Sequence, residues 1–386
     1  MTASTLSPVG LSLPLPILAA DQSPAVTPNQ GAVVAALQRL VASRQTPGLQ
    51  YAFLSESGVQ FSTQAGLADV AGSRPVQPVT SFHGYSVTKT FTAAAIVGLA
   101  LAGRLDLEGP LRRYLPELDD PRSPTLRQVL AHTGGYKNPI PLAWSHRADD
   151  SGFDAAAFFQ RIAGAYGRAA QKPGTHFAYS NVGYLLLGEV IARVTGQPYP
   201  TYIEEVLLQP LRLGSGELLS FDRRAMPNHA RGYIRRMSLL NALLGLFIDR
   251  REFMTGSHGG WSEFSDLLVD GAAYGGLLGN AAGFARYLQA LLRNDPPFPS
   301  PLTQKLFTGQ KTLDGRDIPM ALGWFRGALG SEAFFDHAGG GGGYYCELRI
   351  YPRLRRASVL LCNRTGIKND RLLDELDPPL LTAGGR

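Results

Sequence analysis

The pattern of apolar and polar positions is helical first, then strand-like, then helical again. "TPNQGAVVAALQRLVAS" predicts an amphipathic helix, with Thr27 and Gln30 as a capping box and Pro28 in the first turn. Two strand-like runs in "LQYAFLSESGVQFSTQAGLAD" flank a Ser-Glu-Ser-Gly turn and predict a hairpin. A far more apolar helix is expected from Ser86 to about Gly103.

The middle of the chain, from about residue 105 to 270, is rich in helical patterns and loops. "TLRQVLAHTGG" carries a second capping box, and "NVGYLLLGEVIARVTG" is a helical repeat that stops at Gly196. "NAAGFARYLQALLRN" follows, with Asn280 as its cap. The chain then returns to strands in "AFFDHAGGGGGYYCELRIYP" and "RRASVLLCN".

This order predicts an α/β (α+β) fold, an antiparallel sheet flanked by helices with an inserted, mostly helical lobe. We expect residues 27–104 and 271–386 to form one discontinuous α/β domain and residues 105–270 the helical domain. Residues 1–26 are interpreted as a loosely ordered leader. A signal peptide is not convincing there, because a basic start is missing and two prolines interrupt the apolar run. The compartment stays open between cytoplasm and periplasm or secretion.

Composition excludes several classes of protein. Of the 386 residues, 44% are hydrophobic and 18% charged, which is typical of a folded domain. The net charge of +6 comes from scattered arginines without an aromatic-interleaved stripe, so no nucleic-acid partner is expected. No run of eighteen apolar residues predicts a transmembrane helix. Cys346 and Cys362 are interpreted as buried free thiols, with a disulfide between paired strands as the alternative.

Candidate chemistry begins with Ser86 and Lys89. Residues three apart share a helix face, and a helix start offers free backbone N–H groups and a positive dipole end. A lysine there can help to remove the serine proton. Tyr179 and Asn181 precede another helix, and we expect Lys89 to lower the pKa of the Tyr179 phenol so that it can act as a base.

No metal-ligand spacing appears among the seven histidines and two cysteines, so no metal or cofactor is expected.

Three motifs together resemble the serine β-lactamase and penicillin-binding protein family, which includes carboxylesterases and D-Ala-D-Ala carboxypeptidases. They are Ser86-Val-Thr-Lys89, Tyr179-Ser-Asn181 and His337-Ala-Gly339, in that family's order. Flanking segments such as "GRLDLEGPLRRYLPEL" and "PGTHFAYSNVGYLLLGEVIARVTGQP" look like family framework. The resemblance covers roughly residues 28 to 365.

The resemblance implies a two-step reaction through an acyl-enzyme. Ser86 would be the acylated nucleophile, and Lys89 and Tyr179 would share the proton transfers. The backbone N–H groups of Ser86 and Gly340 would form the oxyanion hole.

The resemblance also implies residues that bind the substrate. Asn181 would orient the substrate, and His337, Ala338 and Gly339 would lie on the strand edge that pairs with it.

The third motif departs from the Lys-Thr-Gly that many family members carry. Ala338 has no hydroxyl, and His337 is largely neutral at pH 7, so the usual grip on a substrate carboxylate is missing. Losing one charge-assisted hydrogen bond costs about 1.5–3 kcal/mol. We therefore expect a carboxylesterase acting on esters or neutral amides, unless an arginine such as Arg364 replaces the grip.

Alternative functions stay open. Within the enzymes they are a D-Ala-D-Ala carboxypeptidase or D-amino-acid peptidase, and then a β-lactamase. Outside the enzymes, the chain would be a catalytically silent scaffold of the same fold. The expected partner is a small ester, amide or peptide, and the oligomeric state stays open.

Two further features have competing interpretations. "RGYIRRMSLLNALLGLFIDRRE", residues 231–252, reads as an ordinary packed helix, as an apolar wall over an acyl-binding pocket, or as a surface that touches lipid. We favour the wall, because the segment precedes a glycine-rich "GGLLGN" that the family places near its active site. His132 is interpreted as a framework residue at a helix end rather than as a base.

Overall fold

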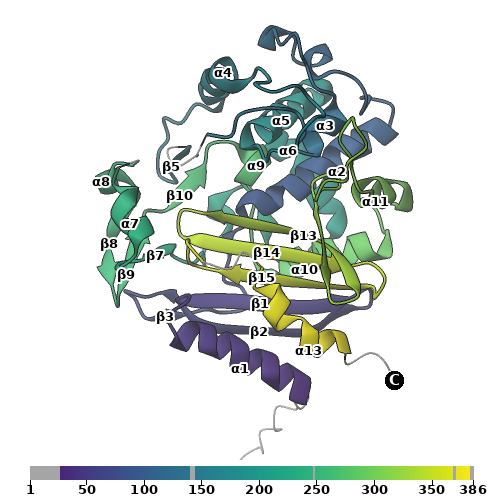
Figure 1. Ribbon diagram of the computed structural model, residues 1–386. Coiled ribbons are helices and arrows are strands. Elements are labelled where there is room, and N and C mark those ends of the chain that lie inside the picture. The colour runs from purple at the N-terminus through teal and green to yellow at the C-terminus, as the bar shows by residue number, and fades with distance from the viewer. Residues whose placement is uncertain (1–26, 140–143, 247, 368–370, 383–386) are drawn as a thin grey trace, which may run out of the picture.

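The computed structural model describes residues 27–139, 144–246, 248–367 and 371–382. The predicted leader, residues 1–26, lies outside these ranges. A seven-stranded antiparallel sheet joins the two ends of the chain in the order β12-β13-β14-β15-β1-β2-β3 (Figure 1). Its strands are β1 Gly48–Ser55, β2 Gly58–Asp69, β3 Arg74–Pro75, β12 Phe325–Leu329, β13 Glu332–Gly341, β14 Tyr344–Tyr351 and β15 Arg356–Cys362.

Both faces of the sheet are covered, which is why β1 is buried along its whole length. Leu49, Tyr51 and Phe53 pack on one face together with α1 Pro28–Ala42, α12 Leu373–Leu376 and α13 Pro378–Leu381. Ala52 and Leu54 point to the other face and join the large core. The helices on that side are α2 Thr88–Leu101, α5 Asn181–Thr195, α9 Ala272–Gly275, α10 Ala281–Arg293 and α11 Ser300–Leu306 (Figure 1).

The local signals of the sequence are confirmed at the ends of these elements. Thr27 and Gln30 cap α1 in both directions, and the second capping box opens α3 Leu126–Leu130. Asn280 caps α10. α5 ends at Gly196, whose φ of 75° is the left-handed conformation that glycine adopts without strain. Both cysteines are buried and free, so the disulfide alternative was wrong.

The middle of the chain contains more strand than its pattern predicted. Its further helices are α4 Ala155–Tyr166, α6 Tyr199–Ile203, α7 Leu239–Leu244 and α8 Arg250–Phe253. Its strands are β5 Ser145–Arg147, β6 Leu219–Ser220, β7 Tyr233–Arg235, β8 Met254–His258, β9 Trp261–Phe264 and β10 Leu267–Val269. β4 Phe82–His83 and β11 Leu278–Gly279 complete the small sheets. Runs this short carry too few alternating positions to be recognised, and the division into two domains stays a prediction.

Residues 231–252 do not form one packed helix, so that interpretation was wrong. β7 comes first, α7 ends at Gly245, and Asp249 caps α8. A small core, separate from the main one, holds this region and consists of Ile234, Leu244, Phe253, Phe264 and Leu267. We call it the side core. Within the described ranges, no helix combines the length and apolar character needed to cross a membrane.

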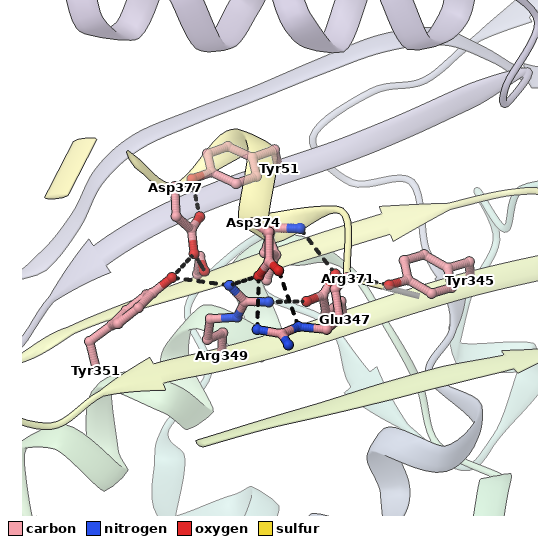
Figure 2. A network of polar contacts seen from close by, with 10 residues as sticks. Tyr51, Tyr345, Glu347, Arg349, Tyr351, Arg371, Asp374 and Asp377 are labelled. Atoms are coloured by element: carbon pink, nitrogen blue, oxygen red, sulfur yellow. Dashed lines mark hydrogen bonds and ion pairs between the residues drawn. The ribbon is translucent and has the colours of Figure 1, made fainter. Parts of the chain in front are cut away.

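A buried polar network fastens the C-terminal helices to the sheet (Figure 2). Asp377, which is fully buried, accepts hydrogen bonds from Tyr51 at 2.8 Å and from Tyr351 and Ser358 at 2.7 Å each. Arg349 donates to Glu347 at 2.8 Å and pairs with Asp374 at 2.7 Å. Because buried polar groups are costly unless they are paired, the network makes one position of α12 and α13 much more stable than others.

Replacing Asp377 with asparagine should destabilise the protein by about 1.5–3 kcal/mol, because an amide cannot accept three hydroxyl hydrogen bonds as a carboxylate does. The measurement is the midpoint of urea unfolding. The matched control is Asp149→Asn, which breaks an exposed pair with Arg147 and should change stability by less than about 1 kcal/mol. Equal midpoints for Asp377→Asn and the unaltered protein would show that the network does not hold the fold.

Candidate active site

A strained turn presents Ser86. Residues Tyr85–Val87 form a single 3₁₀ turn that leads directly into α2. Tyr85 has a φ of 44°, a left-handed conformation that is unusual for a residue with a side chain. Its buried ring stacks on His83 at 5.0 Å, and its hydroxyl donates to the Gly342 carbonyl at 3.1 Å. These contacts hold the strained backbone, and they leave Ser86 only half-buried.

The end of β13 lies directly against this turn. A Cβ on Gly339 would come within 2.2 Å of the Gly84 carbonyl oxygen and 2.9 Å of the Ser86 nitrogen. Any side chain at position 339 would therefore push the strand away from Ser86. Because of this close contact, Gly340 and Ser86 both line the same cavity.

Lys89 is fully buried beside Ser86. Its Nζ donates to Ser86 Oγ at 3.0 Å and to the Tyr274 carbonyl at 2.8 Å. The ring centroids of three tyrosines lie around it, at 5.0 Å for Tyr179, 5.7 Å for Tyr184 and 5.5 Å for Tyr274. Burial holds the pKa of Lys89 well below its ordinary value of 10.5, which favours the neutral amine.

Tyr179 completes the group, but its predicted pKa shift was wrong. Burial raises the pKa of the Tyr179 phenol, although a hydrogen bond with Ser86 opposes the change. Removing the phenol from water disfavours its charged form, and this effect exceeds the opposing hydrogen bond. The raised pKa keeps the proton on the Tyr179 phenol near neutral pH.

His132 holds the segment that carries Tyr179. Its Nδ1 accepts a hydrogen bond from the Ser180 backbone at 3.1 Å, and its carbonyl accepts one from Ala178 at 2.8 Å. The two bonds therefore fasten the chain on both sides of Tyr179, whose ring centroid lies 4.3 Å from that of His132. This geometry supports the framework interpretation.

Asn181 and His337 approach the site from two directions. Ser180 caps α5, which places Asn181 in its first turn and on the cavity wall. Among the described residues, Asn181 Oδ1 has no hydrogen-bond partner. His337 is buried, its Nδ1 bonds to the Gly323 carbonyl at 2.8 Å, and burial together with nearby Lys89 lowers its pKa to about 3. The imidazole is neutral at pH 7, as expected.

Ala338 does not join the site through its side chain. Neighbouring residues of a strand point to opposite faces, and Ala338 packs on the outer face against the α1 and α13 cluster. It is not part of the cavity wall beside Ser86. The predicted role of Ala338 on the strand edge that pairs with the substrate stays a prediction.

The cavity beside Ser86 has a volume of about 310 Å³ and a mostly apolar wall. Its large side chains are Tyr85, Trp144, Ile234, Leu240, Leu244, Ile248, Phe253, Phe264, Leu267, Val269 and Tyr274. Among the lining residues that the structure describes, none carries a charge. Arg364 does not supply one, because its guanidinium donates to the carbonyl oxygens of Gln45, Thr365 and Gly366.

Several residues of this wall were missed by reasoning from the sequence. Trp144, Phe264, Leu267 and Val269 come from short strands and loops far from the three motifs. Tyr274 directly precedes the glycine-rich stretch that was noted as near the site. Its place beside that stretch was the one signal in the sequence that could have indicated Tyr274 as a residue of the cavity wall.

Comparison with known proteins agrees with this geometry. The family model described as Beta-lactamase matches residues 33–377. Esterase EstB of Burkholderia gladioli is 29% identical over 246 residues, which are 59% of this chain and 59% of EstB. Penicillin-binding protein 4* of Bacillus subtilis (strain 168) is 24% identical over 313 residues, 78% of this chain and 64% of the relative. The chain therefore spans less than two thirds of the length of either curated relative.

A solved structure shows the same fold. The octameric penicillin-binding protein homologue from Pyrococcus abyssi superimposes with a TM-score of 0.73 at 22% identity, over 91% of this chain and 77% of that one. The resemblance inferred from the three motifs is confirmed by the family match over most of the chain. The protein, in which Lys89 and Tyr179 contact a Ser86 that lines the cavity, is a member of the Beta-lactamase family of serine hydrolases.

Proposed function

We propose that the protein is a carboxylesterase that forms an acyl-enzyme on Ser86 and acts on esters or neutral amides. The observation that carries this proposal is the uncharged, apolar cavity beside Ser86. A substrate carboxylate would lose its hydration there without gaining a charged partner, which is costly. An ester or neutral amide with an apolar acyl group loses little favourable hydration there, and burial of the acyl group stabilises the complex.

The first half of the reaction transfers the acyl group to the enzyme. The neutral Lys89 amine takes the Ser86 proton as Oγ attacks the substrate carbonyl carbon. The backbone N–H groups of Ser86 and Gly340 stabilise the oxyanion of the tetrahedral intermediate. When the intermediate collapses, the leaving alcohol takes the proton of the Tyr179 phenol, and the Lys89 ammonium restores that proton. Lys89 is then neutral again.

The second half returns the enzyme to its starting state. A water molecule attacks the acyl carbon, and its proton passes to Lys89 as the new tetrahedral intermediate forms. Collapse releases the carboxylic acid, and Ser86 Oγ regains a proton from the same Lys89 and Tyr179 pair. His132 has a positioning role through the Tyr179 segment.

Between the two proposed substrate classes, one observation favours a neutral amide. Asn181 lines the cavity, and its buried Oδ1 is an acceptor without a hydrogen-bond partner in the described structure. A substrate N–H would satisfy it, whereas an ester oxygen would not.

The primary test is labelling with a fluorophosphonate followed by intact-mass analysis. One adduct per chain is expected, located on Ser86 and lost in Ser86→Ala. The second test is kinetic. The kcat/KM for p-nitrophenyl butyrate should be at least about tenfold higher than that for nitrocefin or for an acyl-D-Ala-D-Ala peptide, because each of the latter two substrates carries a carboxylate. No adduct at all favours the silent scaffold, and faster turnover of nitrocefin would contradict the argument from the uncharged cavity.

The pH profile should follow Lys89. At low pH the amine is protonated and cannot accept the Ser86 proton, so kcat/KM rises with pH and levels off once Lys89 is neutral. Because the pKa of Lys89 is lowered, the midpoint should lie well below 10.5. Lys89→Ala should lose at least about 10²-fold in kcat/KM on the plateau above that midpoint, while Lys172→Ala, at an exposed lysine, serves as the control. A midpoint at the ordinary lysine value would contradict Lys89 as the base.

The α7 wall should set the preferred acyl length. Leu244 lines the cavity, whereas its neighbour Leu243 is 42% exposed and does not. Leu244→Ser should lower kcat/KM for p-nitrophenyl octanoate relative to the acetate by about tenfold, since an apolar contact is lost only for the longer chain. Leu243→Ser is the matched control. Equal octanoate-to-acetate ratios in both variants and the unaltered enzyme would reject the wall.

A further inference from the structure

The outer side of α7 and its flanks carry a concentrated apolar patch. Five large hydrophobic side chains within residues 237–246 are exposed, among them Met237 at 90%, Leu239 at 76% and Leu246 at 75%. In the rest of the described structure, such residues are scattered singly. We call Met237, Leu239, Leu240, Leu243 and Leu246 the α7 patch. Soluble surfaces seldom gather apolar side chains in this way without a partner.

The patch is continuous with the mouth of the cavity. Leu240 is 47% exposed and also lines the cavity, and Leu244 of the same helix is buried in the cavity wall. One short helix therefore has a solvent side and a cavity side. α7 and α8 lie together at the periphery of the molecule, away from the helices that cover the sheet (Figure 1).

The charges around the patch are mainly positive. Residues 231–252 contain five arginines, against the two carboxylates of Asp249 and Glu252. Arg236 and Arg251 are exposed close to the patch in sequence, while Arg235 and Arg250 are anchored to protein carbonyls. An apolar surface flanked by arginines is complementary to a lipid surface with anionic headgroups.

We propose that the α7 patch docks the protein on an anionic lipid surface, with its leucines among the acyl chains and its arginines at the headgroups. A second copy of the chain fits less well, because a two-fold contact through the patch would bring the two sets of arginines together. No membrane-spanning helix is needed for such a contact, which lies in the interface. Docking would turn the cavity mouth toward acyl chains, but it does not depend on the proposed hydrolysis.

Vesicle co-sedimentation tests the proposal with the full chain carrying Ser86→Ala, so that no lipid is consumed. The probes are phosphatidylcholine vesicles with and without phosphatidylglycerol. Binding to the anionic vesicles is expected, with weakening in high salt. The triple variant Met237→Glu/Leu239→Glu/Leu246→Glu should reduce the bound fraction at least about tenfold, because three apolar side chains that would enter the lipid are lost and negative charge is added. Leu313→Glu, at an isolated exposed leucine, should bind as before.

A second measurement separates docking from folding and from catalysis. In the chain with Ser86 intact, the triple variant should hydrolyse a soluble short-chain ester at the unaltered rate, because none of the three residues lines the cavity. Failure of the unaltered chain to bind anionic vesicles overturns the proposal, as does equal binding by the triple variant. A dimer that the triple variant splits, without any vesicle binding, assigns the patch to a second copy instead.

Discussion

Burial of the Lys89 amine is the constraint on which the rest of the site depends. α2 begins at the edge of the site and runs through the largest core, so its first turn is as dry as its middle. An ammonium without a carboxylate partner is costly in such surroundings, and the neutral amine is therefore favoured. The packing that stabilises the fold thus also lowers the pKa of the amine that we propose as the base. Tyr179 responds to the same dry surroundings in the opposite direction and keeps its proton.

The sheet separates this chemistry from the anchoring of the chain ends. Alternation along β13 directs His337 toward Lys89 and Ala338 toward the opposite face. On that opposite face, Asp377 and Arg349 tie the C-terminal helices to the strands (Figure 2). The two buried sets of polar groups are therefore divided by one layer of backbone. Gly339, where β13 meets the turn that carries Ser86, can carry no side chain without displacing one of them.

Much of this arrangement was predictable from the sequence, because its signals are local. Capping boxes, a hairpin and the Ser86 and Lys89 spacing each need only a few neighbouring residues, and the three motifs indicated the family. The pKa of Tyr179 was not predictable, since it depends on how completely the fold excludes water from the phenol. The direction of Ala338 required the register of β13. The cavity wall combines Trp144, Leu244 and Phe264 from separate short elements, which no periodicity connects.

The side core supports the wall of the cavity separately from the main core. Its five buried residues pack with one another and form a cluster distinct from the one that surrounds α2. Changes of volume there are absorbed locally, whereas changes around Lys89 would be transmitted through the main core. In the proposed esterase, the acyl preference could consequently change in one region of the molecule while the surroundings of Lys89 stay as they are. Such modularity would let one scaffold diversify its substrates through substitutions in a peripheral segment alone.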